Sequence, residues 1–284
     1  MKNIKIFSAH HKAPIVYKDD CIIPIFVWKN GKNVWLDIIW DDTWDNISEK
    51  NSNYAELTAQ YRVWKNYDLS DVDYVWFCHY RRYFSFWYRP SILLWIKTIF
   101  KNFKTLYERL CFILFYILWI WYMVPINQKV FPKISQNVQK YIEKSRYDIY
   151  LSRPTFWRST FHHLHLKSDE LRNVLRKVIL DNFPEYDKAI KNIDKKRQYH
   201  PWNMYIMKKE IFNDYCNWLF TILFSFESEV DNKKLVPLLK EEPLFITERY
   251  MWYVWEILLN LYLEQQKIMW KTMSTKFSMT QFMN

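Results

Sequence analysis

The sequence predicts an α/β fold in which helices flank a mixed β-sheet. Short apolar segments typical of strands alternate with amphipathic helical segments along the 284 residues. Half of the residues are hydrophobic and a quarter are charged, a composition ordinary for a soluble globular protein with a large core. We therefore expect a single domain over residues 1–284, with one inserted segment of different texture, an apolar helical stretch at residues 91–126.

The first half of the chain begins with two strand candidates. Residues 4–10 (IKIFSAH) are apolar and partly alternating, which predicts a buried first strand. Residues 21–28 contain Pro24, which has no backbone N–H to donate, so this stretch predicts a loop or an edge strand. A polar loop then occupies residues 41–52.

A helix and a second buried strand are expected after this loop. The helix begins near Ser48, and its apolar side chains recur on one face at Leu57, Tyr61 and Trp64. Residues 74–78 form a continuous apolar run, the pattern of a strand covered on both faces. That run ends abruptly in polar sequence, and open α/β sheets bind ligands at the carboxyl ends of their strands.

The second half of the chain repeats the alternation. Residues 147–156 predict a strand followed by a Pro-containing loop, and the next helical stretch breaks at Pro184 before a second helix. Residues 203–207 predict a short strand that runs into a long amphipathic helix. A terminal helix is expected to begin near Glu248 and Arg249.

Residues 91–126 place four basic side chains before a nearly unbroken apolar run at residues 110–126. The run is slightly shorter than the ~20 residues that cross a bilayer, and the segment also suits a helix in the membrane interface. A buried helix hairpin is the alternative. Because the N-terminus lacks the apolar region of a secretory signal, we expect a cytoplasmic protein, with peripheral attachment to the inner face of the membrane if this segment binds lipid.

The net charge indicates which classes of partner the protein could bind, and the cysteine spacing indicates the redox state of its compartment. Lys and Arg number 41 against 30 Asp and Glu, which gives a formal charge of +11. A basic surface suits nucleotide phosphates, nucleic acid or an anionic membrane, and it can also be a general property of the surface without a partner. The four cysteines are far apart with no C-x-x-C, so free thiols in a reducing compartment are expected rather than a zinc or redox pair.

Glycine and tryptophan usage is abnormal. The chain has one glycine, where average usage predicts about 20, and it has 16 tryptophans. Several tryptophans occupy positions where a turn favours glycine, for example Trp44 within the polar loop. We hypothesise that such residues derive from UGA codons, which some bacteria read as Trp and others as Gly. The coding DNA tests this, since UGG codons at these positions would exclude it.

Six motifs, in this order, resemble an uncharacterised bacterial family. They are DDTWDNISEKN with YAELTAQYRVWKN, then DYVWFCHYRRYF, YDIYLSRP, WNMYIMKKEIFNDYCNWLF and LFITERYMWYVW. The family is the DUF4422 group, usually labelled capsular or exopolysaccharide biosynthesis proteins, and the resemblance covers the chain apart from residues 91–126. Its pattern has glycine at the positions of Trp44 and Trp76, whereas Trp64, Trp218 and Trp255 match tryptophans.

The resemblance implies a GT-A-like (Rossmann-like) fold and glycosyltransferase activity. The donor would be a nucleotide-sugar, and the acceptor a saccharide or lipid-linked saccharide of a capsular or exopolysaccharide. Two alternatives stay open: a non-catalytic, membrane-associated assembly factor of the same pathway, and a nucleic-acid-binding protein. Nucleic acid is not expected as a partner, because no helix-turn-helix, zinc-finger or RNA-recognition signature is present.

The expected diphosphate site follows the buried strand at residues 74–78. His79 is a candidate catalytic group that could ligate a metal or donate to a phosphate, and Arg81 and Arg82 could clamp the diphosphate. The leaving group requires either a divalent cation, Mn²⁺ or Mg²⁺, or basic side chains, and no Asp-x-Asp occurs here. A solvated arginine pair and a structurally hydrogen-bonded histidine are the alternatives.

Further candidates come from the loops around the other strands. Asp45, Asn46 and Ser48 could contact nucleotide or sugar at a helix N-terminus, and could equally cap that helix.

Three more candidates follow the later strands. Asp148 could form a second wall of the cleft, and His200 and Asn203 could touch the donor sugar or a metal.

Glu248 is a candidate general base and Arg249 its partner or a phosphate ligand, with a capped helix start as the alternative. The histidines at 162, 163 and 165 resemble a metal tract, but a structural or acceptor-contacting role is favoured because no carboxylate is near.

Overall fold

The computed structural model describes thirteen stretches of the chain. These are residues 2–11, 16–27, 38–80, 82–84, 123–125, 131–144, 146–152, 155–156, 168–196, 198–201, 203–235, 249–269 and 279–281. For residues 82, 123–125, 155–156, 268–269 and 279–281 the account is of the backbone alone.

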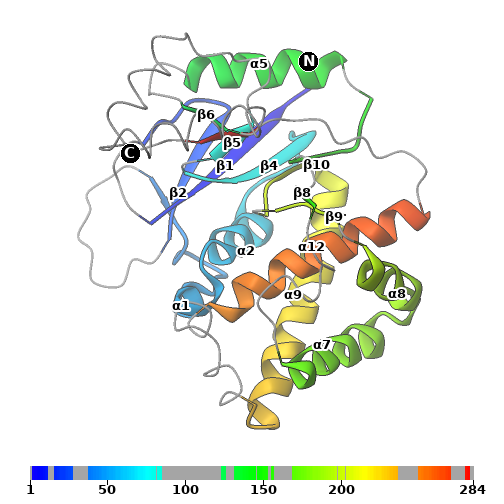
Figure 1. The fold of residues 1–284 in the computed structure, drawn as a ribbon. Helices are drawn as coiled ribbons and strands as arrows, with labels where there is room; N and C mark the ends of the chain where they lie inside the picture. The colour runs from blue at the N-terminus through cyan, green and yellow to red at the C-terminus, as the bar shows by residue number, and fades with distance from the viewer. Residues whose placement is uncertain are drawn as a thin grey trace, which may run out of the picture.

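A six-stranded sheet forms the centre of the molecule (Figure 1). Its spatial order is β3-β2-β1-β4-β10-β7. The first four of these run parallel, and β10 is antiparallel to both of its neighbours, so β7 runs in the same direction as β4. The strands are β1 (Ile4–His10), β2 (Ile22–Phe26), β3 (Ile39–Trp40), β4 (Tyr74–His79), β7 (Ile149–Leu151) and β10 (Tyr205–Lys208).

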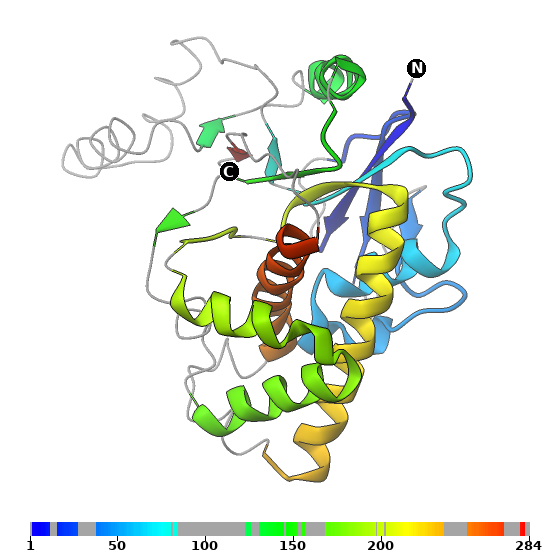
Figure 2. The same cartoon turned by 90° about the vertical axis from the view of Figure 1, so that its right-hand side faces the viewer.

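Helices cover both faces of the sheet, as Figures 1 and 2 show. On one face lies α5 (Phe131–Lys144), and the opposite face carries the larger helical layer. The helices of that layer are α2 (Leu57–Asn66), α7 (Asp169–Asn182), α8 (Asp187–Lys195), α9 (Lys209–Asn232) and α12 (Tyr250–Met269).

Alternate residues of each strand enter two separate cores. Phe7 and Phe77 pack with the large helical layer, whereas Ile6, Trp76 and Ile206 pack with α5. This follows from the two-residue period of a strand, whose successive side chains point to opposite faces. Because both faces are covered, the strands read as continuous apolar runs.

Short elements complete the described chain. A 3-10 turn η1 (Ser48–Lys50) and a one-turn helix α1 (Asn51–Tyr54) precede α2, and η3 (Pro184–Tyr186) joins α7 to α8. A small sheet pairs β5 (Arg82–Phe84), β11 (Met279–Gln281) and β6 (Met123–Pro125), and β8 (Thr155–Phe156) pairs with β9 (Gln198–Tyr199).

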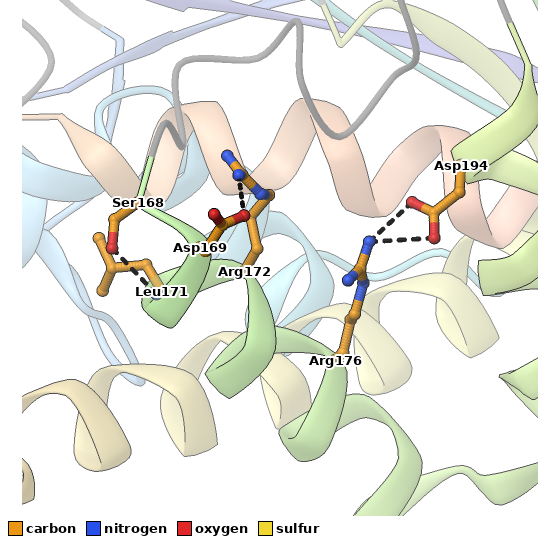
Figure 3. Close-up of polar contacts among 6 residues, drawn as sticks. All are labelled: Ser168, Asp169, Leu171, Arg172, Arg176 and Asp194. Carbon is orange, nitrogen blue, oxygen red and sulfur yellow. Dashed lines mark hydrogen bonds and ion pairs between the residues drawn. The ribbon is translucent and has the colours of Figure 1, made fainter.

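Polar contacts fix the α7–α8 pair (Figure 3). The Ser168 side chain accepts from the Leu171 N–H at 3.3 Å and caps α7. Arg176 on α7 donates to both carboxylate oxygens of Asp194 on α8, at 2.8 and 3.0 Å. The cap sets where α7 begins, and the ion pair ties it to α8 across the break at Pro184.

Most strand and helix predictions are confirmed. The first strand has the predicted bounds, β4 extends the predicted run by one residue, and the α/β class is that of a mixed, mostly parallel sheet with helices. Leu57 and Tyr61 are buried on one face of α2 with Trp64 packed beside them. The helix break occurs at Pro184 as predicted.

Three expectations are wrong. Residues 22–26 are not an edge strand, because β3 pairs with Ile25 and Phe26, beyond Pro24 and its missing N–H. The helix expected from Ser48 onward is interrupted at Ala55, which has φ 48°. Residues 123–125 of the expected apolar helix form a strand. Residues 91–122 lie outside the described part of the chain, and within the described stretches no helix is long and apolar enough to cross a membrane.

The suspect tryptophans differ from one another. Trp44 has φ 58° and is 75% exposed, so its backbone adopts the left-handed conformation that glycine adopts without steric cost. Trp76 is a fully buried residue of β4, stacked on Phe84 at 5.2 Å. The turn argument for glycine therefore holds at Trp44, whereas Trp76, where the family pattern has glycine, is a core residue of a strand. Trp218 and Trp255 are buried in the large core, and Trp28 and Trp35 lie outside the described residues.

Replacing each tryptophan by glycine should separate these two cases. Trp44→Gly relieves a positive φ worth roughly 1 kcal/mol and loses only an exposed contact with Arg62, so the free energy of unfolding should stay within ~1 kcal/mol of its starting value. Trp76→Gly removes a buried ring and should cost at least ~3 kcal/mol. Urea denaturation of both variants measures this, and equal losses would contradict the assignment.

Candidate functional site

One edge of the sheet collects most of the polar side chains that follow strands. The parallel strands β1 and β4 end there at His10 and His79. Since β10 is antiparallel, it begins at the same edge. Tyr205 lies opposite Phe77, which puts Asn203 level with His79. We call this the carboxyl edge.

His79 is held by a carboxylate that the sequence did not reveal. Its Nδ1 lies 3.0 Å from Oε1 of Glu56, and both side chains are largely buried. Burial alone would raise the pKa of Glu56, but the charge and hydrogen bond of His79, with a backbone hydrogen bond, outweigh it and lower this pKa to about 2. Glu56 is thus a carboxylate at neutral pH that accepts a hydrogen bond from Nδ1–H of His79.

The break between α1 and α2 places Glu56 at this edge. Ala55 takes a positive φ, and its carbonyl accepts hydrogen bonds from the side chains of Asn51, at 2.9 Å, and Thr58, at 3.0 Å. The same hydroxyl, which has one hydrogen to donate, also lies within hydrogen-bond distance of the carboxylate of the buried Asp41. These bonds satisfy the backbone at the interruption, and Glu56 follows as the N-cap residue of α2. An acid at a helix start is common, so the sequence carried no sharper signal for it.

Trp252 on α12 lies against the same histidine. Its ring centroid is 6.3 Å from that of His79 in an edge-to-face arrangement. The indole Nε1 is buried and has no hydrogen-bond partner within the described stretches. An unsatisfied buried donor is costly, which makes this N–H a candidate ligand contact.

Within the described chain, Asn203 also has buried polar atoms without hydrogen-bond partners, in this case two of them. It is 1% exposed, has φ 49°, and neither its amide nitrogen nor its amide oxygen has a partner among the residues that the structure describes. Because asparagine tolerates the left-handed conformation, the buried amide without described partners is the informative feature, and it makes Asn203 a candidate ligand contact.

His10 is a neutral neighbour. Its Nε2 lies 3.1 Å from the Ser8 hydroxyl, and burial, with a smaller contribution from nearby His11, lowers its pKa to about 3. Its ring also packs 5.4 Å from Tyr80. His10 therefore lines the edge as an uncharged hydrogen-bonding group at neutral pH.

The ring Nδ1 and the backbone of His200 are hydrogen-bonded, which indicates a structural role. Its Nδ1 lies 2.7 Å from the carbonyl of Ser152, just beyond β7, and its backbone N–H and C=O both bond the side chain of Asn260. Burial lowers its pKa to about 4, so the ring is neutral and Nδ1–H is the donor. His200 thereby fixes the segment that leads to Asn203.

The loop residues Asp45, Asn46 and Ser48 hold a turn. Asp45 accepts from the Tyr61 hydroxyl at 3.1 Å, and the Asn46 side chain accepts from the Ser48 N–H at 3.1 Å. The Asn46 bond closes an Asx turn before η1, whose N-cap residue is Ile47 and has no side-chain cap, so the helix-capping interpretation is not borne out. Their contact with a nucleotide or sugar stays a prediction.

Of the remaining candidates, Asp148 is placed away from His79. Asp148 lies at the amino end of β7, the opposite edge of the sheet, in an ion pair with Lys208 at 2.6 Å. Arg249 is exposed just before α12. Glu248, Arg81 and the histidines at 162, 163 and 165 lie outside the described residues, as does the side chain of Arg82.

The described residues do not form an evident binding site for a divalent cation. They contain no group of three or more His, Cys, Asp or Glu side chains that could hold a metal ion. At His79 the imidazole and the Glu56 carboxylate are already bonded to each other. We therefore assign no step to Mn²⁺ or Mg²⁺.

The site thus contains two predicted residues and three that sequence reasoning missed. His79 and Asn203 lie together at the carboxyl edge, where Glu56, Trp252 and His10 join them. The missed residues come from separate elements, and nothing in their local sequence indicated that they meet.

Comparisons with known proteins agree with this architecture. The structure of the WbbM bifunctional glycosyltransferase in its apo state is similar with a TM-score of 0.75 and 25% sequence identity. The match covers all of this chain and 46% of that chain, so the present chain spans less than half of WbbM. No curated protein matches the chain. A family model described as a domain of unknown function, DUF4422, matches residues 5–267. The chain therefore belongs to the DUF4422 family.

Proposed function

We propose that this protein is a glycosyltransferase of GT-A-like fold that takes a nucleotide-sugar donor and extends a capsular or exopolysaccharide. The likeness to a glycosyltransferase over the full chain supports a role of this class. WbbM is bifunctional and about twice as long, so its activities suggest the reaction type for this chain and not the sugar.

The observation that carries the proposal is the His79–Glu56 pair at the carboxyl edge. Sugar transfer requires a group that removes the proton of the acceptor hydroxyl as the new bond forms. With Nδ1–H donating to Glu56, the basic nitrogen of His79 is Nε2, and the carboxylate stabilises the imidazolium that forms. His79 is therefore the general base in this proposal, and Glu56 orients it.

Unsatisfied donors beside this pair suit the donor substrate. The indole N–H of Trp252 and the amide of Asn203 can donate to diphosphate or sugar oxygens, which would satisfy buried groups that lack partners in the described structure. Arg81 and Arg82, which follow His79 after Tyr80, stay the predicted clamp for the diphosphate charge. Glu248 stays a second candidate base.

Hydrolysis of UDP-sugars tests the reaction class. The purified protein should release UDP slowly from at least one UDP-sugar of a panel, measured with Mn²⁺, with Mg²⁺ and with EDTA. A catalytically silent protein that still supports polysaccharide assembly would favour the assembly-factor alternative. Binding of random DNA that weakens steeply with salt would favour the nucleic-acid alternative.

Substitutions in the pair should lower turnover strongly. His79→Ala and Glu56→Gln should each reduce kcat by about 10²–10⁴, the usual contribution of a general base, and the double variant should be little worse than the singles. Asp194→Asn is the matched control, because it breaks the ion pair with Arg176 in the α7–α8 pair, remote in sequence from these residues. Near-normal turnover of both single variants would contradict the assignment.

Glu56 should also make stability depend on pH in the acid range. Its folded pKa is lowered from 4.5 to about 2, so its contribution is present above pH ~4.5 and is lost as pH falls toward 2. The full effect is on the order of 3 kcal/mol. Urea denaturation at pH 5 and pH 2.5 should show that the stability lost by Glu56→Gln shrinks on acidification. A loss that is equal at both pH values would mean that Glu56 is not an ion-paired carboxylate.

A further inference from the structure

Helix α12 carries a buried polar stripe on an otherwise apolar surface. Glu256, Asn260 and Glu264 recur every four residues and are 6%, 7% and 6% exposed, among neighbours such as Leu259 and Leu263 that are fully apolar. Buried glutamates are rare unless they are paired or functional. The stripe begins one turn after Trp252, which contacts His79.

The stripe ends in a cavity between α8 and α12, two helices that pack side by side (Figure 1). Its volume is about 180 Å³. At ~30 Å³ per water this is room for a group the size of one sugar ring. We call it the α8–α12 cavity, and its lining is Ile193, Lys196, Gln198, His200, Asn260, Leu263, Glu264 and Lys267.

The polar groups of the cavity are fixed in orientation. Glu264 is bonded to Lys196 and to the side-chain amide of Asn192 at 3.2 Å. His200 is neutral and donates a hydrogen bond from Nδ1–H to the Ser152 carbonyl, so its Nε2 is an acceptor. Oriented carboxylate and imidazole acceptors on a rigid frame suit the hydroxyl groups of a saccharide.

The charge of the cavity is positive. Lys196 and Glu264 offset each other, whereas Lys267 forms no ion pair with any residue in the described ranges. Within the part of the chain that the structure describes, Lys267 is thus an unpaired cation in a cavity whose other polar groups can hydrogen-bond the hydroxyl groups of a ligand. An acidic substituent on the sugar would complete the pairing.

A short segment, from His200 to Asn203, connects the cavity to the carboxyl edge. His200 lines the cavity and Asn203 lies three residues later, so their Cα atoms are at most ~10 Å apart. Asn260 bonds the backbone of His200 on both sides and holds this short connection to α12. Along α12, Glu264 lies 12 residues after Trp252, roughly 18 Å at 1.5 Å per residue, so a ligand at Glu264 would lie several sugar units from His79.

We propose that the α8–α12 cavity is the acceptor subsite and binds a saccharide ring that carries an anionic group, either a carboxylate or a phosphate. Lys267 pairs with that group, and Glu264 and His200 accept hydrogen bonds from the ring hydroxyls. The role as acceptor subsite rests on the proposed transferase function, whereas binding of an acidic sugar does not.

Direct binding separates the two anionic groups. Titration of the protein with glucuronate, glucose 6-phosphate and glucose, followed by NMR or calorimetry, should show tighter binding of one acidic sugar than of glucose. Lys267→Ala should weaken it at least tenfold and Lys267→Arg should retain it. Lys188→Ala, an exposed lysine on α8 outside the cavity lining, is the control and should match the unmodified protein. Equal binding of all three sugars, or no effect of Lys267→Ala, would overturn the proposal.

Kinetics then tests the acceptor role. With a nucleotide-sugar that the protein hydrolyses, Lys267→Ala and Glu264→Gln should leave hydrolysis without acceptor unchanged and raise KM for an acidic acceptor at least tenfold. Normal acceptor KM in both variants would overturn the acceptor role while the transferase function stands. Failure of the unmodified protein to hydrolyse any nucleotide-sugar would instead overturn the transferase function, and the sugar titration would still decide whether the cavity binds acidic sugars.

Discussion

The hydrogen bonding of β4 on both sides is the constraint on which the rest of this structure depends. Its parallel pairing with β1 and antiparallel pairing with β10 fix which side chains emerge at each edge. A slip of one residue would send Trp76 into the large core and Phe77 toward α5, so burial on both faces holds the register. That register is what sets His79 level with Asn203.

Hydrogen-bond satisfaction distinguishes His200 from Asn203. His200 is as buried as its neighbours, but its ring and backbone are bonded to Ser152 and Asn260. Asn203, three residues later, has an amide with no partner in the described part of the chain. Because an unsatisfied buried amide costs free energy, its persistence is explained most simply by a ligand that completes it.

Helix α12 gives the proposed site its layout. Trp252 at its start meets His79, and its polar stripe leads along the helix to Lys267 and the α8–α12 cavity. One rigid element thus carries side chains for both substrates, with a separation set by the helical rise. In the proposed function, rigid placement of this kind would orient a distant sugar of the acceptor relative to His79 without a further ordering cost.

The sequence by itself determined the elements whose signals are local. Strand β1, strand β4 and the break at Pro184 follow from apolar runs and from the missing proline N–H, and His79 was found because it ends a buried strand. Only the tertiary structure decided that Pro24 lies in an interior strand, that Ala55 interrupts a helix and that Glu56 meets His79. Those outcomes depend on pairing between residues far apart in the chain. No local pattern encodes which hydrogen-bond partner a distant strand or helix will supply.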